Sequence, residues 1–231
     1  MLRFKCGPDG MDCTLRLEGI FQSLFRHYGS LHWWPAETPF EVAVGAILTQ
    51  NTTWIQVEKA IDNLRQAGLL SPAALREVAT SDLELKVRPA GFFRQKAHRL
   101  KLLAEHLCAF HQGRLEVLLA GPTDEVRREL LSLKGVGPET ADSILLYAGG
   151  HPVFVVDAYT YRLCCRLGLY AGRADYQALQ SLFMDHLPAD AALFNAYHGL
   201  IVQLCKDVCR KRSPRCPDCP LAADCPSAGS L

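Results

Sequence analysis

The chain has 231 residues, of which 49% are hydrophobic and 21% charged, and 25 Lys and Arg against 24 Asp and Glu give a formal net charge of +1. A chain of this length buries roughly 70 to 75% of its unfolded surface, and a charged fraction of 21% with 10 Phe and 3 Trp excludes a disordered protein. No apolar run approaches the roughly 18 residues that cross a bilayer, and no apolar segment of secretory length opens the chain, so we expect a cytoplasmic protein without a membrane partner.

Helical spacing of apolar residues dominates the chain. Apolar stripes predict helices over residues 15–28, 40–48 and 54–64, and a longer helix follows near residues 94–110. The one run typical of a strand, residues 153–156, is too short and isolated to form a sheet. The sequence therefore predicts an all-α protein.

A glycine turn joins two predicted helices between residues 123 and 149. Thr123 is a suitable N-cap for a helix that ends at Lys134, and Pro138 suits the first position of the next helix. Gly135 and Gly137 permit positive φ and a close approach to the backbone. The N-H groups at such a helix start favour an anion such as a DNA phosphate, although an ordinary helical hairpin has the same pattern.

Cysteines crowd the end of the chain. Cys209, Cys216, Cys219 and Cys225 are separated by six, two and five residues, and clustered thiols in a reducing compartment are typically metal ligands. Thiolates suit zinc and iron-sulfur clusters alike. Cys205 is expected to be a free structural thiol, and we expect the five remaining cysteines to be inert and buried: Cys6, Cys13, Cys108, Cys164 and Cys165.

Several segments in chain order resemble the endonuclease III superfamily of DNA glycosylases. Residues 133–141 (LKGVGPETA), followed by 155–157 (VVD), resemble its helix-hairpin-helix and downstream aspartate. Residues 39–41 (PFE) and 49–52 (TQNT) resemble its early helix and its DNA-gap loop, and the cysteine tail is similar to its [4Fe-4S] loop. The resemblance covers about residues 15–226.

The resemblance implies two helical domains with a DNA-binding groove between them. A six-helix domain would span residues 36–152 and contain the hairpin, and residues 1–35 plus 153–231 would form a discontinuous domain with the [4Fe-4S] loop. Cys209, Cys216, Cys219 and Cys225 would hold the cluster, whose role would be structural. The partner would be double-stranded DNA with a damaged base, bound by a monomer.

The resemblance also implies site residues. Asp157 would be the catalytic carboxylate, which stabilises positive charge on the sugar and orients water, while its alternative role is to cap the next helix. Arg162 would be structural or face a phosphate. The expected DNA contacts are Gln50, as the wedge that fills the gap, and Lys134, Gly135, Gly137, Glu139, Arg210 and Arg212. A helix-capping or loop hydrogen bond is the alternative for Gln50.

One position departs from the bifunctional members of the superfamily. They have a nucleophilic lysine two residues after the second hairpin glycine, and this chain has Glu139 there. We therefore predict a monofunctional glycosylase with little or no lyase activity.

All three tryptophans lie between residues 33 and 54. Residues 33–35 (WWP) and Trp54 resemble the 3-methyladenine DNA glycosylase III branch. An alkylated purine is cationic, so aromatic rings can select it by stacking and by cation-π attraction. The expected base pocket consists of Trp33, Trp34, Trp54 and Tyr159, although large aromatic side chains often only fill a core.

These features predict hydrolytic release of alkylated purines such as 3-methyladenine in base excision repair. Two alternatives stay open: an endonuclease III-like oxidised-pyrimidine glycosylase with lyase activity, and a non-catalytic module that binds damage. An adenine-mismatch glycosylase is a weaker candidate, because we expect no further recognition domain after Cys225.

Overall fold

The computed structural model describes residues 12–31 and 33–229, which divide into two compact units. One unit combines residues up to Trp33 with those from Pro152 onward, and the other runs from Trp34 to His151. The described residues contain helices and no strand, so the all-α prediction is confirmed. The β-like run at residues 153–156 is a buried extended segment without a strand partner among them.

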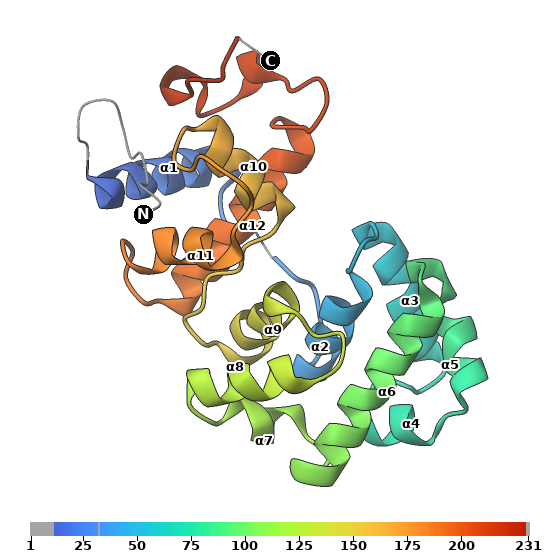
Figure 1. Cartoon of the computed structure of the whole chain (residues 1–231). Helices are drawn as coiled ribbons and strands as arrows, with labels where there is room; N and C mark the ends of the chain where they lie inside the picture. Colours follow the sequence, from blue (N-terminus) through green and yellow to red (C-terminus); the bar gives the residue numbers. More distant parts are fainter. Residues whose placement is uncertain (1–11, 32, 230–231) are drawn as a thin grey trace. The chain divides into compact units, whose positions relative to one another are not determined.

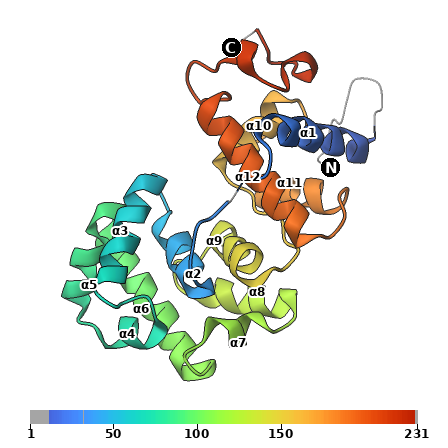
Figure 2. The same cartoon turned by 180° about the vertical axis from the view of Figure 1, so that it is seen from behind.

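The unit from Trp34 to His151 is fully described and contains eight α-helices where six were expected, because short helices divide the connections. Its elements are α2 (Pro39–Leu48), α3 (Trp54–Gln66), α4 (Pro72–Glu77), α5 (Thr80–Val87), η1 (Arg88–Ala90), α6 (Phe93–Phe110), α7 (Leu115–Leu119), α8 (Thr123–Ser132), α9 (Pro138–Ser143) and η2 (Ile144–Ala148). Figures 1 and 2 show α6 running beside α4 and α5.

Helix α2 is the centre of this unit. Every residue from Phe40 to Leu48 is buried, and α3, α6, α9 and η2 pack around it. Even Glu41 is only 3% exposed, and its carboxylate accepts a hydrogen bond of 2.7 Å from Arg65 of α3. Because α2 is apolar on all sides, it can only be stable inside a shell of other helices.

The second unit brings sequence-distant helices together. It contains α1 (Cys13–Tyr28), α10 (Ala158–Arg166), α11 (Tyr176–Met184), α12 (Ala191–Asp207), η3 (Cys216–Asp218) and η4 (Ala222–Asp224). Figure 1 shows α12 passing beside α1 and α10. The Phe154 ring stacks on Phe183 with centroids 3.9 Å apart, and the Tyr197 hydroxyl donates a hydrogen bond to the Leu17 carbonyl oxygen at 2.9 Å.

The structure bears on the expectation about membrane spans and on two of the predicted thiols. Among the helices that the structure describes, none is both long and apolar enough to cross a membrane. Cys6 lies outside the described residues, and Cys13 is half-buried and disulfide-bonded, so the expectation of an inert thiol at Cys13 is wrong.

Candidate functional site

Asp157 is half-buried at the start of α10. Its Oδ1 accepts hydrogen bonds from the Thr160 N-H at 2.8 Å and from the Thr160 hydroxyl at 3.0 Å, so the side chain caps the helix. Its Oδ2 lies 3.6 Å from Nε2 of His198, a buried residue of α12. One carboxylate oxygen is thus held by the helix start, and the other faces an imidazole.

These contacts determine the charge of the carboxyl group. Burial alone raises the pKa of Asp157, but His198 and the two Thr160 donors together lower it below its ordinary value. Asp157 is therefore ionised at neutral pH. His198 was not predicted from the sequence, because a histidine on an apolar helix resembles a core residue.

Trp33 lies in the same unit as Asp157 and packs on α12. Its ring meets His198 edge-on with centroids 6.2 Å apart, and the Lys206 ammonium lies 5.3 Å from the ring centroid. A Cβ at Gly199 would come within 2.9 Å of the indole, so glycine makes this approach possible. The indole Nε1 is buried and has no hydrogen-bond partner within the described part of the chain, which is costly in a protein interior.

Tyr159 follows Asp157 on α10. The Arg162 guanidinium carbon lies 5.1 Å from the centre of the Tyr159 ring. The Arg162 guanidinium itself donates to the carbonyl oxygens of Cys209 at 2.9 Å and Cys205 at 3.1 Å. Arg162 therefore ties α10 to the end of α12, which agrees with the structural alternative expected for it.

Trp34 and Trp54 form an aromatic cluster in the other unit. Their rings meet edge-on at 5.3 Å, and Trp34 also stacks on Tyr147 with centroids 4.9 Å apart and planes 20° apart. We call Trp34, Trp54 and Tyr147 the aromatic cluster. The structure thus joins two of the four expected pocket residues, while Trp33 and Tyr159 belong to the unit of Asp157.

Two features of the aromatic cluster are unusual. Trp34 has φ of 64°, a left-handed conformation that costs energy for a bulky residue and recurs at active sites and ligand clamps. Tyr147, which the sequence analysis missed, lies on η2, a π-helical turn. Such turns are rare and are often found at functional sites, but no local sequence pattern predicts them.

The predicted hairpin is present, with shifted boundaries. Helix α8 ends at Ser132, two residues earlier than expected, and Pro122 is its N-cap where Thr123 was expected. The Thr123 hydroxyl is instead hydrogen-bonded to Nδ1 of His151 at 2.9 Å. Lys134 and Glu139 are both exposed on either side of the turn.

The two hairpin glycines differ in what the protein requires of them. Gly135 has φ of 89°, which favours glycine, and a Cβ there would lie 2.3 Å from Nε of Arg99, so the arginine side chain would have to move. Gly137 has φ of -96°, which any residue adopts, and a Cβ there would meet no atom of the described residues within 4 Å. The protein itself therefore gives no reason for glycine at position 137.

Gln50 is bound to the hairpin. Its amide nitrogen donates to the Gly135 carbonyl oxygen at 3.1 Å and to the Thr140 hydroxyl at 2.8 Å, and Arg99 donates to its side-chain oxygen. These contacts match the loop hydrogen bond that was the alternative for Gln50. To fill a gap in DNA, the side chain would have to leave them.

The four C-terminal cysteines line one pocket with apolar side chains that include Leu163, Leu167 and Leu221. The four cysteines are Cys209, Cys216, Cys219 and Cys225. Arg166 donates to the Cys209 sulfur at 3.2 Å. A hydrogen bond from Cys205, opposed by burial and helped by Arg166, lowers the pKa of Cys209 to about 6.

This donor set fits an iron-sulfur cluster. Four thiolate donors in an apolar pocket are the ligands that such clusters use, and Cys205 lies outside the pocket lining. Among the described residues, no three cysteine sulfurs lie within 4.8 Å of one another.

The basic residues beside the cysteines differ in where their side chains lie: two are bonded to the backbone, and two are exposed in a loop. Arg210 and Arg215 both donate to the Asp207 carbonyl oxygen, at 3.0 Å and at 2.9 Å. Lys211 and Arg212 are exposed in the loop that follows Arg210. Arg212 thus retains a position from which it can reach a ligand in solvent.

Comparison with known proteins identifies the family. Residues 44–189 match the model of the HhH-GPD superfamily of base excision DNA repair proteins. The chain belongs to this superfamily. The match covers the aromatic residues Trp54 and Tyr147, the hairpin and Asp157.

Individual DNA glycosylases are similar to most of the chain. A protein of Methanocaldococcus jannaschii, provisionally named DNA repair glycosylase MJ1434, is 45% identical over 89% of this chain and 94% of its own length. The H. pylori 3-methyladenine DNA glycosylase MagIII, whose crystal structure holds 1,N6-ethenoadenine, has 32% sequence identity to this chain. Its structure matches with a TM-score of 0.71 over 85% of this chain and 98% of that one.

A third comparison concerns the fold alone. A trapped covalent intermediate of endonuclease III with DNA has a TM-score of 0.82 at 24% identity, over 95% of this chain and 99% of that one. The comparisons confirm the HhH-GPD glycosylase family and the helix-hairpin-helix that the sequence motifs indicated.

Proposed function

We propose that this HhH-GPD protein is a monofunctional DNA glycosylase that hydrolyses the N-glycosidic bond of alkylated purines. The observation that carries the substrate class is the aromatic cluster, in which a strained Trp34 is stacked on Tyr147 and touched by Trp54. Such rings favour a flat cation through stacking and cation-π attraction, worth roughly 1 to 3 kcal/mol per base. The relative MagIII, whose structure holds 1,N6-ethenoadenine, supports the same class.

The chemistry needs one carboxylate and one water molecule. An alkylated purine already carries positive charge, so it leaves without a strong general acid, and positive charge develops on the sugar. Asp157 would stabilise that charge and accept a proton from the attacking water. Its lowered pKa and its caps on Thr160 support this role, because the carboxylate is ionised and fixed in direction.

Glu139 supports the absence of a lyase step. It occupies the position where the bifunctional relatives have their lysine, and its carboxylate cannot form a Schiff base with the sugar. Lys134 is exposed before the turn, where a phosphate contact is the simpler role for it. The product would therefore be an abasic site with an intact backbone.

Gly137 supports a DNA contact at the hairpin. Because neither its φ nor the protein around it requires glycine, a close approach by something outside the chain explains the missing side chain. The backbone of a phosphate strand meets this requirement. Lys134 and Gly135 would contact the same strand, and Arg210 and Arg212 would provide charge beside the cysteine loop.

We also propose that Cys209, Cys216, Cys219 and Cys225 hold a [4Fe-4S] cluster. When bound, the cluster would act as a structural crosslink that fixes the loop and its basic residues, without electron transfer in the reaction. The apolar pocket that the four cysteines share supports this assignment.

The test is mass spectrometry of the bases that the protein releases from duplex DNA with mixed alkylation and oxidation damage. We expect release of alkylated purines, with oxidised pyrimidines left in place. No protein should be trapped on abasic DNA by borohydride, since a Schiff base would be needed for trapping.

Two results would contradict the proposal. Release of oxidised pyrimidines together with borohydride trapping would identify the endonuclease III-like alternative. Tight binding to damaged duplex without release of any base would identify the non-catalytic alternative. An ultraviolet-visible spectrum without iron-sulfur absorption would contradict the cluster assignment while leaving the reaction assignment standing.

A further inference from the structure

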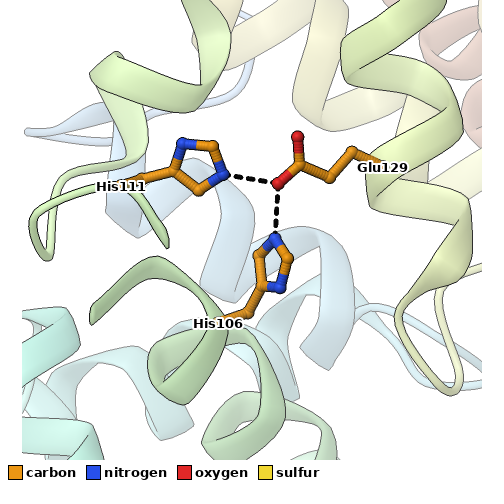
Figure 3. Close-up of side chains that lie close together, drawn as sticks. All are labelled: His106, His111 and Glu129. Carbon is orange, nitrogen blue, oxygen red and sulfur yellow. Dashed lines mark hydrogen bonds and ion pairs between the residues drawn. The ribbon is translucent and has the colours of Figure 1, made fainter. Parts of the chain in front are cut away.

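Three side chains of metal-ligating type converge in the unit from Trp34 to His151, away from the cysteine tail. Nε2 of His106 lies 2.6 Å from Oε1 of Glu129, and Nε2 of His111 contacts the same oxygen. All three ligand atoms lie within 4.8 Å of one another, and Figure 3 shows both rings directing one nitrogen at the carboxylate. We call His106, His111 and Glu129 the histidine cluster.

The local fold explains why these residues meet. His106 is in the last turns of α6, and His111 is its C-cap, where the backbone leaves helical geometry. The next two residues, Gln112 and Gly113, have φ of 57° and 69°, and the Gly113 N-H donates to the Leu107 carbonyl oxygen at 2.9 Å. This tight turn brings His111 back beside His106, and α8 supplies Glu129 from across the gap.

The histidine cluster is partly buried, and a partly buried set of donors holds an ion better than a solvent-exposed set does. The two imidazoles are 17% and 15% exposed and the carboxylate 33%, so the donors are largely desolvated and water can still enter. Figure 3 shows the second nitrogen of each ring pointing away from the cluster, so both Nε2 atoms face a common point. In zinc sites, two imidazoles and one carboxylate commonly leave a fourth position for water.

The dimensions are also close to those of a metal site. Zinc bonds of about 2.0 to 2.2 Å to nitrogen and oxygen place neighbouring ligand atoms about 3.3 Å apart. The His106 nitrogen and the Glu129 oxygen are 2.6 Å apart, so they would separate by less than about 1 Å to admit the ion. Rotation of the partly exposed Glu129 side chain can supply this movement.

We propose that His106, His111 and Glu129 bind a divalent transition-metal ion of the zinc class, at a site separate from the cysteine tail. Imidazole nitrogen with one carboxylate is a borderline donor set, which favours zinc and its neighbours over magnesium or calcium. The ion replaces the shared hydrogen bonds of the cluster with three coordinate bonds.

The position of the ion implies a structural role. The site joins the end of α6 to α8, and α8 leads directly into the hairpin turn at residues 133–137. A crosslink at this point restricts how α8 and the turn move relative to α6. Metal binding therefore raises the thermal stability of the protein and does not supply the reacting group.

The first test measures Zn²⁺ bound by the full chain, by titration with a competing chromogenic chelator, in the wild type and in His106→Gln, His111→Gln and Glu129→Gln. We expect each variant to bind one Zn²⁺ at least tenfold more weakly, because even the outer partners of metal ligands contribute roughly 10- to 100-fold. His98→Gln is the matched control, since His98 is an exposed histidine of the same helix. It should bind Zn²⁺ as the wild type does.

The second test uses the wild type alone, so it does not depend on how well any variant folds. X-ray absorption at the zinc edge, measured on the wild type loaded with one equivalent of Zn²⁺, reports the ligands of the bound ion. We expect that zinc to have nitrogen and oxygen ligands at about 2.0 to 2.2 Å. A sulfur shell, or equal zinc affinity in all four variants, would overturn the proposal, and neither result bears on base release.

Discussion

At Asp157, burial and hydrogen bonding oppose each other. Burial raises the pKa of the carboxyl group, whereas His198 and Thr160 lower it, and the donors prevail. Because the pKa is depressed in the folded protein, the ionised carboxylate contributes stability above its unfolded value of about 3.9. That contribution is lost as the pH falls through the folded pKa.

His198→Gln should move the acid limb of the base-release profile to higher pH. The substitution removes the neighbour that lowers the pKa of Asp157, so protonation of the carboxyl group starts at a higher pH. The measurement is the single-turnover rate of base release against pH. His186→Gln, a half-buried histidine that follows α11, is the control and should leave the limb unchanged. A lower rate with an unmoved limb would contradict the role of His198.

The rings of Trp34 and Tyr147 lie too close together for a base to fit between them. Their ring centroids are 4.9 Å apart, whereas a base between them would need the rings about 7 Å apart, which is twice the aromatic contact distance. A base must therefore bind on an outer face of the cluster or displace Trp34. The left-handed φ of Trp34 makes displacement less costly, because movement can relieve strain.

Tyr147→Ala should weaken selection of alkylated purines. Loss of one stacking ring is worth roughly 1 to 3 kcal/mol, or about 5- to 150-fold in kcat/KM. The check is steady-state release of 3-methyladenine from methylated DNA, with Phe25→Ala as the control, because Phe25 is a 40% exposed aromatic residue of α1. Equal kcat/KM values in the two variants would mean that the aromatic cluster is not part of the base pocket.

At the scale of elements, the two hairpin glycines differ in what the protein itself requires of them. Gly135 needs its left-handed φ and faces Arg99, whereas Gly137 has ordinary φ and open space. Glycine at the two motif positions therefore has two different physical causes, and separate substitutions at positions 135 and 137 can distinguish them.

Gly135→Ala should lower stability by about 1 kcal/mol or more, because alanine is strained at positive φ and its Cβ meets Arg99. Gly137→Ala should leave the melting temperature near that of the wild type and weaken binding to duplex DNA. Thermal unfolding and DNA affinity at one salt concentration measure both effects. Unchanged DNA affinity in Gly137→Ala would exclude a close phosphate contact at this turn.

The helices on either side of the hairpin are joined by a buried ion pair. Arg127 of α8 donates to the two carboxylate oxygens of Asp142 in α9, at 2.6 and 3.1 Å, and the Asp142 side chain is 0% exposed. Breaking such a pair leaves a buried charge, which typically costs about 3 to 5 kcal/mol.

Arg127→Met should therefore destabilise the protein by about 3 kcal/mol or more in denaturant unfolding. Arg128→Met, at the exposed neighbouring position, should change stability by less than about 0.5 kcal/mol. Equal midpoints for the two variants would mean that the ion pair does not hold the hairpin helices together.

At the scale of the whole molecule, local patterns predicted the elements well. The helices expected at residues 40–48, 54–64 and 94–110 are found at Pro39–Leu48, Trp54–Gln66 and Phe93–Phe110. Their apolar spacing is a local property, so a single sequence suffices to find them. The hairpin was predicted for the same reason, since its glycines and Pro138 are adjacent in the chain.

Properties that depend on tertiary contacts could not be predicted. Trp33 and Trp34 are neighbours in the sequence, but the chain passes from one unit to the other between them, so only Trp34 joins Trp54. Tyr147 and His198 lie on apolar helix faces where the sequence indicates core residues. His106, His111 and Glu129 meet only because a turn and a separate helix bring them together.

The central claim, that the carboxylate of Asp157 carries the reaction, is tested most directly by the single-turnover rate of base release from methylated duplex DNA. Asp157→Asn should lower that rate by at least about 100-fold. Asp175→Asn, which alters another helix-capping aspartate, should keep the wild-type rate, and asparagine caps helices well enough to preserve both folds. Wild-type release by Asp157→Asn would contradict the claim.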